Sequence, residues 1–513
     1  MMGLTWYILG LLTTASVIFI LKLSKKYVLN WIAYSGYGMG VFLILFSIAW
    51  SVGAVLEGVP RAGSMGMLLF GLPGIIFLTL SLRYITDKLK KRSIFSQPTA
   101  SQMQKSRPLV QAQSSSTPKR SKSALKNSEL FSNILRYGAY LSLLVAFVIG
   151  MNADSKDYEA MVRAKFKDEK LTKINDDPIV FQLGEKKAEG GEYILIQEGQ
   201  GYGGPFVIGV RIHDDAKVHA VMPLDHKETP SFAVKVEEAH YGSQFINKHI
   251  SDNFIVGDDI DAVSGATVTT MAATEAVRKG AHLAAVQYFK LEPSWVKVPW
   301  KVGIAEILIL IIFILAFFPK IINKKPFKYV YMTATVIIVG FYLNASVSIG
   351  NMAAVFIGYF PSFKDHLTWW ILVAGSLLAI FFTGKNVYCN RVCPFYAIEF
   401  LLQQISGSKW TPSPAVLKHA KTGVNFLLWL SLMLIFLTKH PALGSFEPFA
   451  MMFSLEGLGI QWYILPFAII GSFFTSSFWC RFFCPVGGMF NNLIKLRKYI
   501  LSFLPKRVKK GVK

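Results

Sequence analysis

Cysteine is scarce in this chain and absent from its long polar stretch. Only four cysteines occur in 513 residues, which argues against a disulfide framework. Acidic residues are also few, 31 against 54 lysines and arginines. Charged residues make up 17% of the chain and hydrophobic residues 52%. Such a composition is too apolar for an ordinary soluble protein, so we predict a membrane protein.

The absence of other motifs argues against haem cofactors and a nucleic-acid partner. No Cys-x-x-Cys-His occurs, which excludes c-type haem attachment. His366, His419 and His440 lie near the ends of apolar segments, which argues against a bis-histidine b-type haem. The net charge of +23 comes from lysines and arginines that flank apolar runs rather than from an aromatic-studded soluble face. This distribution indicates membrane topology and no nucleic-acid partner.

Nine apolar runs are long enough to cross the hydrocarbon core, which takes about 20 residues of helix. The runs are residues 4–21, 34–56, 65–82, 134–151, 302–319, 329–349, 367–384, 422–438 and 459–479. We therefore expect an α-helical polytopic membrane protein of about nine helices. The flanking lysines and arginines alternate between the two sides. They predict that the N-terminus lies outside and the C-terminus in the cytoplasm; the membrane is expected to be a bacterial cytoplasmic membrane.

Composition divides the chain into six segments. They are a three-helix membrane module (1–92), a basic Ser/Pro/Gln-rich cytoplasmic linker (93–128), a fourth membrane helix (129–151), a polar extracytoplasmic domain (152–298), a five-helix membrane domain (299–494) and a basic cytoplasmic tail (495–513). A linker so basic is expected to lie against anionic membrane lipid.

The polar domain is predicted to have an α+β fold. Strand-like runs occur at 179–181, 193–196, 207–212 and 232–236, and helix-like runs near 158–170 and 271–289. The domain also contains Asp261-Ala262-Val263-Ser264-Gly265-Ala266-Thr267. Small neighbours leave the Thr267 hydroxyl open to a phosphate or a modifying enzyme, and a helix N-terminus here would favour an anion. We predict a flavin phosphoester on Thr267; the alternative is an ordinary loop threonine.

This loop resembles the FMN-binding domain of Rnf and Na⁺-translocating NADH:quinone reductase subunits and of nitrous oxide reductase regulators. Gly201-Tyr202-Gly203-Gly204 and Glu228-Thr229-Pro230 occur in the order expected of that domain. The resemblance covers about residues 175–290. It implies covalent FMN on Thr267, attached by a flavin transferase. The residues around the cofactor would be Gly201, Tyr202, Gly203, Gly204, Asp261, Ser264, Gly265 and Ala266.

All four cysteines lie in two copies of a Cys-x₃-Cys-Pro pattern, Cys389 to Pro394 and Cys480 to Pro485. Each copy follows a Phe-Phe-Thr phrase, which indicates an internal repeat. Positions four apart share a helix face, so each pair offers two thiolates to one side, and the proline is expected to end or kink the helix.

Two such pairs predict one shared site with Cys389, Cys393, Cys480 and Cys484 as ligands. Soft thiolates suit an iron–sulfur cluster or zinc, and Arg391 and Arg481 would offset the negative charge. If the protein transfers electrons, an iron–sulfur cluster suits the site better than zinc. Two redox-active dithiols, or cysteines that merely pack as small hydrophobes, are the alternatives.

The layout of residues 130–500 resembles the nitrous oxide reductase regulator group, which includes the C proteins of reductive dehalogenase operons. An FMN domain after the first helix of a six-helix unit and two Cys-x₃-Cys-Pro motifs carry the resemblance. The chain lacks further ferredoxin-type Cys-x₂-Cys-x₂-Cys motifs, as in the shorter dehalogenase-type members. The turn at 57–66, followed by Phe70-Gly71-Leu72-Pro73-Gly74, resembles reductive dehalogenase membrane anchors; a generic helical hairpin is the alternative.

These features predict a membrane flavoprotein that passes electrons from quinol or a cytoplasmic donor to an exported reductase, as the electron-transfer component of an oxidoreductase system. About 30 Å of hydrocarbon would separate the flavin from the cysteines, so a quinone or another carrier is expected between them. The alternative is a redox-sensing regulator or maturation factor for an exported metalloenzyme. A channel or transporter is disfavoured, because solute passage needs neither motif.

Glu306 is expected either to serve a quinone or proton, or to pair with Lys301 or Trp300.

Overall fold

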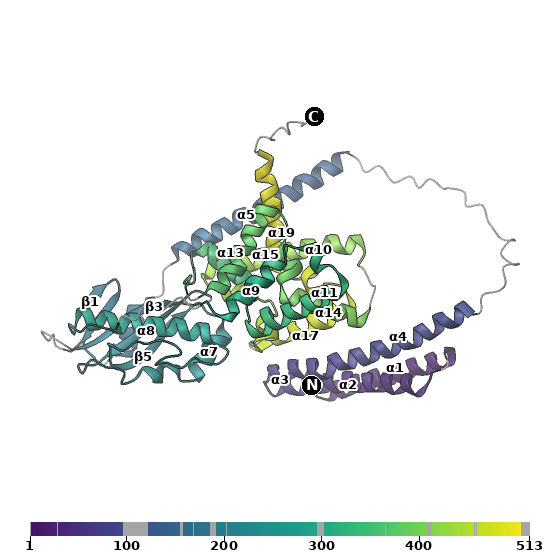
Figure 1. The fold of residues 1–513 in the computed structure, drawn as a ribbon, viewed down its shortest axis with the longest axis horizontal. Helices are drawn as coiled ribbons and strands as arrows, with labels where there is room; N and C mark the ends of the chain where they lie inside the picture. Colours follow the sequence, from purple (N-terminus) through teal and green to yellow (C-terminus); the bar gives the residue numbers. More distant parts are fainter. Residues whose placement is uncertain are drawn as a thin grey trace. The chain divides into compact units, whose positions relative to one another are not determined.

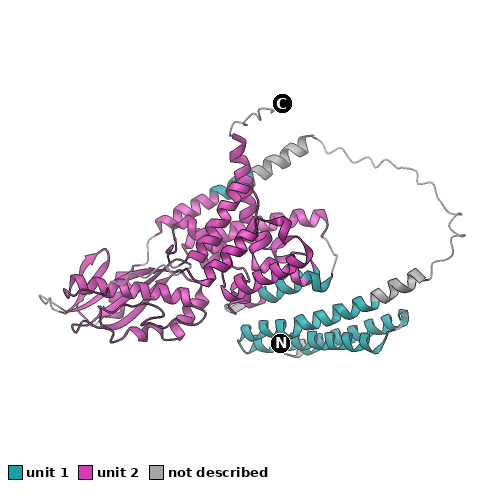
Figure 2. Cartoon of the chain, in the orientation of Figure 1, with its two compact units in different colours: residues 1–141, 403–409, 465–474 teal, residues 142–402, 410–464, 475–513 magenta. Residues whose placement is uncertain are grey.

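The computed structural model forms two compact units (Figure 2), made of residues 1–141, 403–409 and 465–474, and of residues 142–402, 410–464 and 475–513. The residues that it describes are 2–27, 29–95, 122–153, 157–167, 169–184, 191–201, 203–294, 302–364, 366–407, 412–455, 457 and 459–503.

The N-terminal helices pack closely through glycine. They are α1 (Met2–Lys26), α2 (Trp31–Leu56), α3 (Pro60–Gly66), the π-helix η1 (Met67–Gly71) and α4 (Leu72–Phe95). A Cβ on Gly40 of α2 would lie 2.7 Å from the backbone nitrogen of Leu78 on α4. Such close approach is typical of small residues between membrane helices. The predicted turn at 57–66 is shorter than expected, because Pro60 begins α3.

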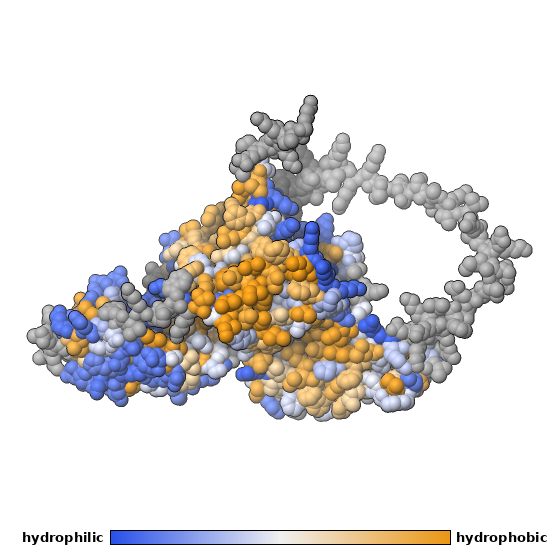
Figure 3. Space-filling model, in the orientation of Figure 1, coloured by the Kyte–Doolittle hydropathy of each residue, from blue (hydrophilic) through white to orange (hydrophobic). Residues whose placement is uncertain are grey.

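The chain is a multi-pass membrane protein. Among the residues that the structure describes, five helices are long and apolar enough to span a membrane: Trp6–Lys25, Trp31–Leu56, Pro60–Ile85, Ile134–Asn152 and Pro414–Thr438. The other four predicted runs appear as short or interrupted helices. Pro319 begins a new helix inside the run 302–319, and the run 329–349 passes through a π-helix and loses helical structure at Asn344. Figure 3 shows apolar residues gathered over the helical parts.

The polar domain is an antiparallel five-stranded sheet with helices (Figure 1), and its strands follow the order β1-β2-β3-β4-β5. The strands are β1 (Leu171–Asp176), β2 (Ile179–Leu183), β3 (Glu192–Gln200), β4 (Pro205–Ile212) and β5 (Val218–His226). Its helices are α6 (Tyr158–Lys165), α7 (Pro230–Glu238), the 3₁₀-helix η2 (Tyr241–Phe245) and α8 (Thr267–Gln287), and α5 (Lys122–Asn152) precedes it.

Helix α8 is buried against β3 and β4 and supplies alanines to the larger core of this domain. Its backbone comes so near the sheet that a Cβ on Gly199 would lie 1.9 Å from the Ala272 carbonyl oxygen. The predicted strands in β2, β3 and β4 are confirmed, and β1 and β5 were missed. The predicted strand at 232–236 is wrong, since this run lies in α7. The helix predicted at 158–170 ends earlier, at Lys165.

The remaining helices carry the cysteines. They are α9 (Ile304–Leu315), α10 (Pro319–Ile322), α11 (Lys325–Thr335), η3 (Val336–Tyr342), α12 (Ile349–Ile357), α13 (Leu367–Thr383), η4 (Tyr388–Val392), α14 (Pro394–Ser406), α15 (Pro414–Thr438), η5 (Pro441–Gly444), α16 (Phe449–Phe453), η6 (Gly459–Tyr463), α17 (Ile464–Phe474), α18 (Phe478–Phe482) and α19 (Pro485–Phe503). The series α13, η4, α14 and the series α17, α18, α19 each place a Cys-x₃-Cys pair between an apolar helix and a helix that begins with proline. The helices α14 and α19 were not predicted from the sequence.

Candidate functional site

The Ser-Gly-Ala-Thr loop presents Thr267 at the start of a long helix. Thr267 is exposed and is the first residue of α8, while Ala266 before it is buried. Gly265 has φ +77, a conformation that glycine adopts readily. The side chain of Gln244 holds the backbone of Asp261 by two hydrogen bonds, of 2.8 and 3.2 Å. The hydroxyl therefore lies where the free N–H groups of a 21-residue helix favour an anion.

A lysine from α7 adds positive charge to this loop. A Cβ built on Gly265 would lie 2.8 Å from Nζ of Lys235, so the ammonium group is next to the loop. Together with the helix N-terminus, this cation suits a phosphate on Thr267. Lys235 was not predicted as a site residue, because its run resembles a strand in the sequence. Pro230 after Thr229 was the available helix-start signal.

The glycine turn is linked to α8 by a buried acid. The turn is closed by the hydrogen bond from Gly201 N to Gly204 O, at 2.9 Å. Glu228, 2% exposed, accepts hydrogen bonds from Gly203 N (3.2 Å) and from Oγ1 of Thr269 in the first turn of α8 (3.4 Å). The structure thus brings Gly201, Gly203 and Gly204 to the helix that begins at Thr267. Tyr202 lies outside the described residues.

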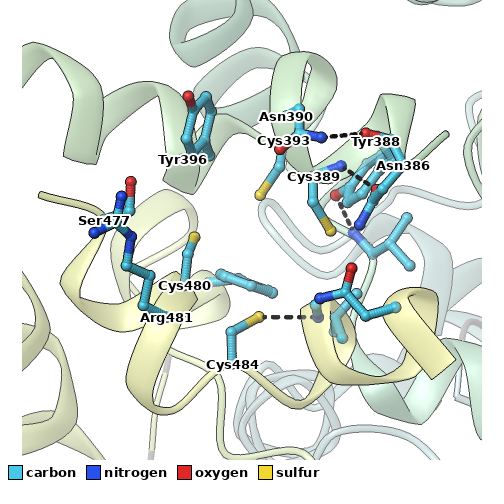
Figure 4. Close-up of a pocket in the computed structure, with 15 residues that line it drawn as sticks. Asn386, Tyr388, Cys389, Asn390, Cys393, Tyr396, Ser477, Cys480, Arg481 and Cys484 are labelled. Carbon is cyan, nitrogen blue, oxygen red and sulfur yellow. Dashed lines mark hydrogen bonds between the residues drawn. The ribbon is translucent and has the colours of Figure 1, made fainter. Parts of the chain in front are cut away.

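The four cysteines line one cavity of about 280 Å³. Figure 4 shows their sulfur atoms converging on it from the two repeats. Cys389 lies in η4 and Cys480 in α18, and both are partly exposed, while Cys393 and Cys484 are buried. The expectation that proline ends or kinks each helix is confirmed, since η4 ends at Val392 and α18 at Phe482; Pro394 and Pro485 are then the first residues of α14 and α19. Proline fits there because the first turn leaves backbone N–H groups unused.

Helix starts therefore face two of the sulfurs. Gly487 N donates to Sγ of Cys484 at 3.5 Å. Burial raises the pKa of Cys393 to about 11, although the backbone N–H groups of Tyr396 and Phe395 oppose this shift. Burial likewise raises the pKa of the Cys480 and Cys484 thiols well above the ordinary value. Free thiolates are thus disfavoured here, whereas bound metal would keep the sulfurs deprotonated.

The two arginines beside the cysteines differ. Arg481 lines the cavity, where its charge can offset that of thiolates. Arg391 does not line it; its Nη1 donates to the Ala316 carbonyl oxygen at 2.8 Å, just after α9. The role expected of Arg391, to offset the charge of thiolates, stays a prediction. A further residue, Glu399, is fully buried and accepts a hydrogen bond from Trp479 N at 2.7 Å, which fixes the start of α18.

The four sulfurs could serve more than one kind of metal centre. Within the part of the chain that the structure describes, no three His, Cys, Asp or Glu side chains are grouped as ligands of one metal ion. Four cysteines around one cavity are the ligand set of an iron–sulfur cluster and also of a structural zinc ion. None of the four forms a disulfide.

Glu306, predicted to act on a quinone or proton or to pair nearby, caps α9. Its Oε2 accepts from Gly303 N at 2.8 Å, and its Oε1 accepts from Oγ1 of Thr368 at 3.3 Å. These contacts give the acid a structural partner at the helix start. Lys301 and Trp300 lie outside the described residues.

Comparison with protein families finds three matches. Residues 4–89 match a chloroethene reductive dehalogenase membrane anchor protein, residues 201–282 an FMN-binding domain, and residues 365–413 and 462–507 a 4Fe-4S binding domain. The chain is 22% identical to the regulatory protein NosR of Pseudomonas aeruginosa over 246 residues, 43% of this chain and 33% of NosR. The chain is NosR/NirI-like.

Two other relatives are similar to parts of the chain. Protein NirI of Paracoccus denitrificans is 22% identical over 212 residues, 38% of this chain and 31% of NirI. A component of the proton-translocating ferredoxin:NAD(+) oxidoreductase complex of Clostridium ljungdahlii is 30% identical over 118 residues, 22% of this chain and 62% of that component. The chain thus spans about a third of the length of NosR and NirI. No solved structure matches.

These matches support the predicted motifs as whole segments, not the role of any single residue. The FMN-binding match contains both the glycine turn and Thr267, and the 4Fe-4S match occurs once around each cysteine pair, which confirms the internal repeat. The anchor match confirms the resemblance of the N-terminal helices. The roles of individual residues stay predictions.

Proposed function

We propose that this protein moves electrons at a membrane, with FMN on Thr267 and one [4Fe–4S] cluster held by Cys389, Cys393, Cys480 and Cys484. The observation that carries the proposal is that the cysteine pairs of two 4Fe-4S matches line one cavity. Each pair alone supplies two ligands, whereas such a cluster takes four. The cluster would supply one-electron chemistry, and the chain supplies burial, N–H groups at helix starts and the charge of Arg481.

For the flavin, we infer a phosphoester on Oγ1 of Thr267, made by a flavin transferase. Its support is the exposure of Thr267, the helix N-terminus behind it and the ammonium of Lys235 beside the loop. Asp261, Ser264, Gly265 and Ala266 would shape the loop for the transferase, and the glycine turn at 201–204 would let the cofactor approach the backbone.

The predicted nine crossings and their orientation belong to the same proposal. Short and interrupted helices can lie at membrane depth when neighbouring protein satisfies their backbone. The flavin domain would then be extracytoplasmic and the C-terminus cytoplasmic, with lipid around the helices. Quinol or a cytoplasmic donor would supply electrons, and a quinone would serve as a carrier between the two sites.

The acceptor would be an exported respiratory reductase. The match of residues 4–89 to a reductive dehalogenase membrane anchor favours a dehalogenase among such reductases. The relatives named as regulatory proteins support a second candidate, a redox-sensing regulator or maturation factor. Steady turnover of a quinol with an exported reductase supports flux, whereas a single reduction without turnover supports the regulator.

The flavin is tested by in-gel ultraviolet fluorescence after denaturing electrophoresis of protein co-expressed with a flavin transferase. The wild-type band should fluoresce and the Thr267→Val band should be dark. Thr172→Val, which makes the same change at an exposed threonine of β1, is the matched control and should keep a fluorescent band. A fluorescent Thr267→Val band, or a dark wild-type band, would reject the attachment.

A further inference from the structure

A buried acid holds the start of α12 near the cysteines. Glu447 lies between η5 and α16, is 7% exposed and accepts a hydrogen bond at Oε1 from Ile349 N at 2.7 Å. Oγ of Ser445, two residues earlier, accepts from Gly350 N at 3.0 Å. Both acceptors take N–H groups of the first turn of α12. This segment therefore caps that helix from a distant part of the chain.

The same segment forms part of the wall of the cysteine cavity. Phe449, two residues after Glu447, lines the cavity, and so does Val347, two residues before Ile349. The Glu447 carboxyl also acts electrostatically on the Cys484 thiol. A change of charge in the cavity therefore changes the electrostatic potential at this carboxyl, because little water lies between them to screen it.

Glu447 is well suited to take up a proton. Its Oε2 has no hydrogen-bond partner within the residues that the structure describes. Burial raises the pKa of Glu447 to about 7, and the Ile349 N–H and the Ser445 hydroxyl oppose this shift. The groups that act on it are the first N–H of α12, its own backbone N–H and Ser445. Glu447 in turn helps to raise the pKa of the Cys484 thiol, just before α19.

We propose that Glu447 binds one proton when the cysteine-held centre gains one electron. The inference rests on the proposed function, since it needs a reducible centre at these cysteines. The balance is simple: the donor gives one electron to the centre, water supplies one proton, and the carboxylate becomes a neutral carboxyl. An added negative charge nearby favours the protonated acid, so reduction and protonation support each other.

The test is a redox titration of the full-length protein in detergent, followed by electron paramagnetic resonance of the cluster. Above about pH 7, the pKa of Glu447, uptake of one proton per electron lowers the wild-type midpoint potential by about 59 mV per pH unit. Glu447→Gln keeps an oxygen acceptor for Ile349 N–H but does not titrate, so its midpoint should not change with pH.

Two controls separate titration from helix capping. Glu447→Asp keeps a titratable carboxyl and should keep a slope. Glu306→Gln changes the acid that caps α9 and should leave the wild-type slope unchanged. A reducible centre with a flat wild-type midpoint, or a slope that persists in Glu447→Gln, overturns the inference alone. Wild-type protein without a reducible cysteine-held centre overturns the proposed function as well.

Discussion

The flavin domain and the cysteine-bearing helices both place their candidate cofactor residues at helix starts, but one site is exposed and the other is buried. In each, the candidate cofactor residue stands at a helix start, Thr267 on α8 and Cys393 and Cys484 just before α14 and α19. Thr267 is exposed, whereas Cys393 and Cys484 are each 5% exposed. Helix N–H groups favour negative charge in both places, but only the exposed site is open to another protein.

Because of this difference in burial, we expect the flavin and the cluster to be incorporated in different ways. A transferase can reach Thr267 after the domain has folded, so the flavin should contribute little to the packing of that domain. The cysteines come from two repeats about ninety residues apart and meet inside the helices. A cluster there would join the repeats, because bound metal stabilises the state that holds its ligands together.

The largest predicted effect is the loss of the cluster in the variant Cys484→Ser. Losing one of four thiolates should remove the cluster signal completely, while the band of covalent flavin keeps its wild-type fluorescence. Iron content, electron paramagnetic resonance and in-gel fluorescence measure this on one sample. Ser454→Ala, in the same helical region, is the control and should change neither readout. Loss of covalent flavin in Cys484→Ser would show that the two sites do not assemble independently.

The next effect is expected from Gly201→Ala. A Cβ at this position would lie 1.8 Å from Oε1 of Glu228, so either the glycine turn or the buried carboxyl that links it to α8 must move. Overpacking of this kind costs about 1–3 kcal/mol. Thermal unfolding followed by the fluorescence of covalent flavin should show the loss. Gly242→Ala is the matched control, since its nearest neighbours would be 3.6 Å away. Equal melting of the two variants would contradict the tight turn.

Lys235→Ala should slow flavin attachment by about tenfold, because a hydrogen bond to a charged group contributes about 1.5–3 kcal/mol and water replaces part of it. Lys235→Arg keeps the charge and should be slowed less. Lys217→Ala, whose ammonium pairs with Asp215, is the control in the same domain. The measurement is a time course of in-gel fluorescence with purified transferase. An unchanged rate in Lys235→Ala would exclude the phosphate role.

The two regions also differ in how much the sequence could predict. Cys-x₃-Cys-Pro and Ser-Gly-Ala-Thr are short and contiguous, so their residues could be named from the chain alone. Lys235 and Glu447 reach their sites from distant segments, and only packing brings them there. Phe232 to Val236 alternates like a strand, yet Pro230 starts a helix. The apolar run at 329–349 predicts one span, but hydropathy does not detect the π-helix and the positive φ of Asn344 that interrupt it.

The smallest effect concerns pH and the flavin domain alone. His282 on α8 is 4% exposed, and its Nε2 lies 2.8 Å from the Asp252 carbonyl oxygen. Burial lowers the pKa of His282, so below about pH 6.5 the unfolded chain binds more protons at this site than the folded domain does. Stability should therefore fall as pH drops through this range and level off above it. His282→Gln should flatten the dependence of the melting temperature, read from covalent flavin, whereas His219→Gln on the sheet should not. Because the cysteine-bearing helices have no part in this titration, the cluster signal should stay constant over the same pH range.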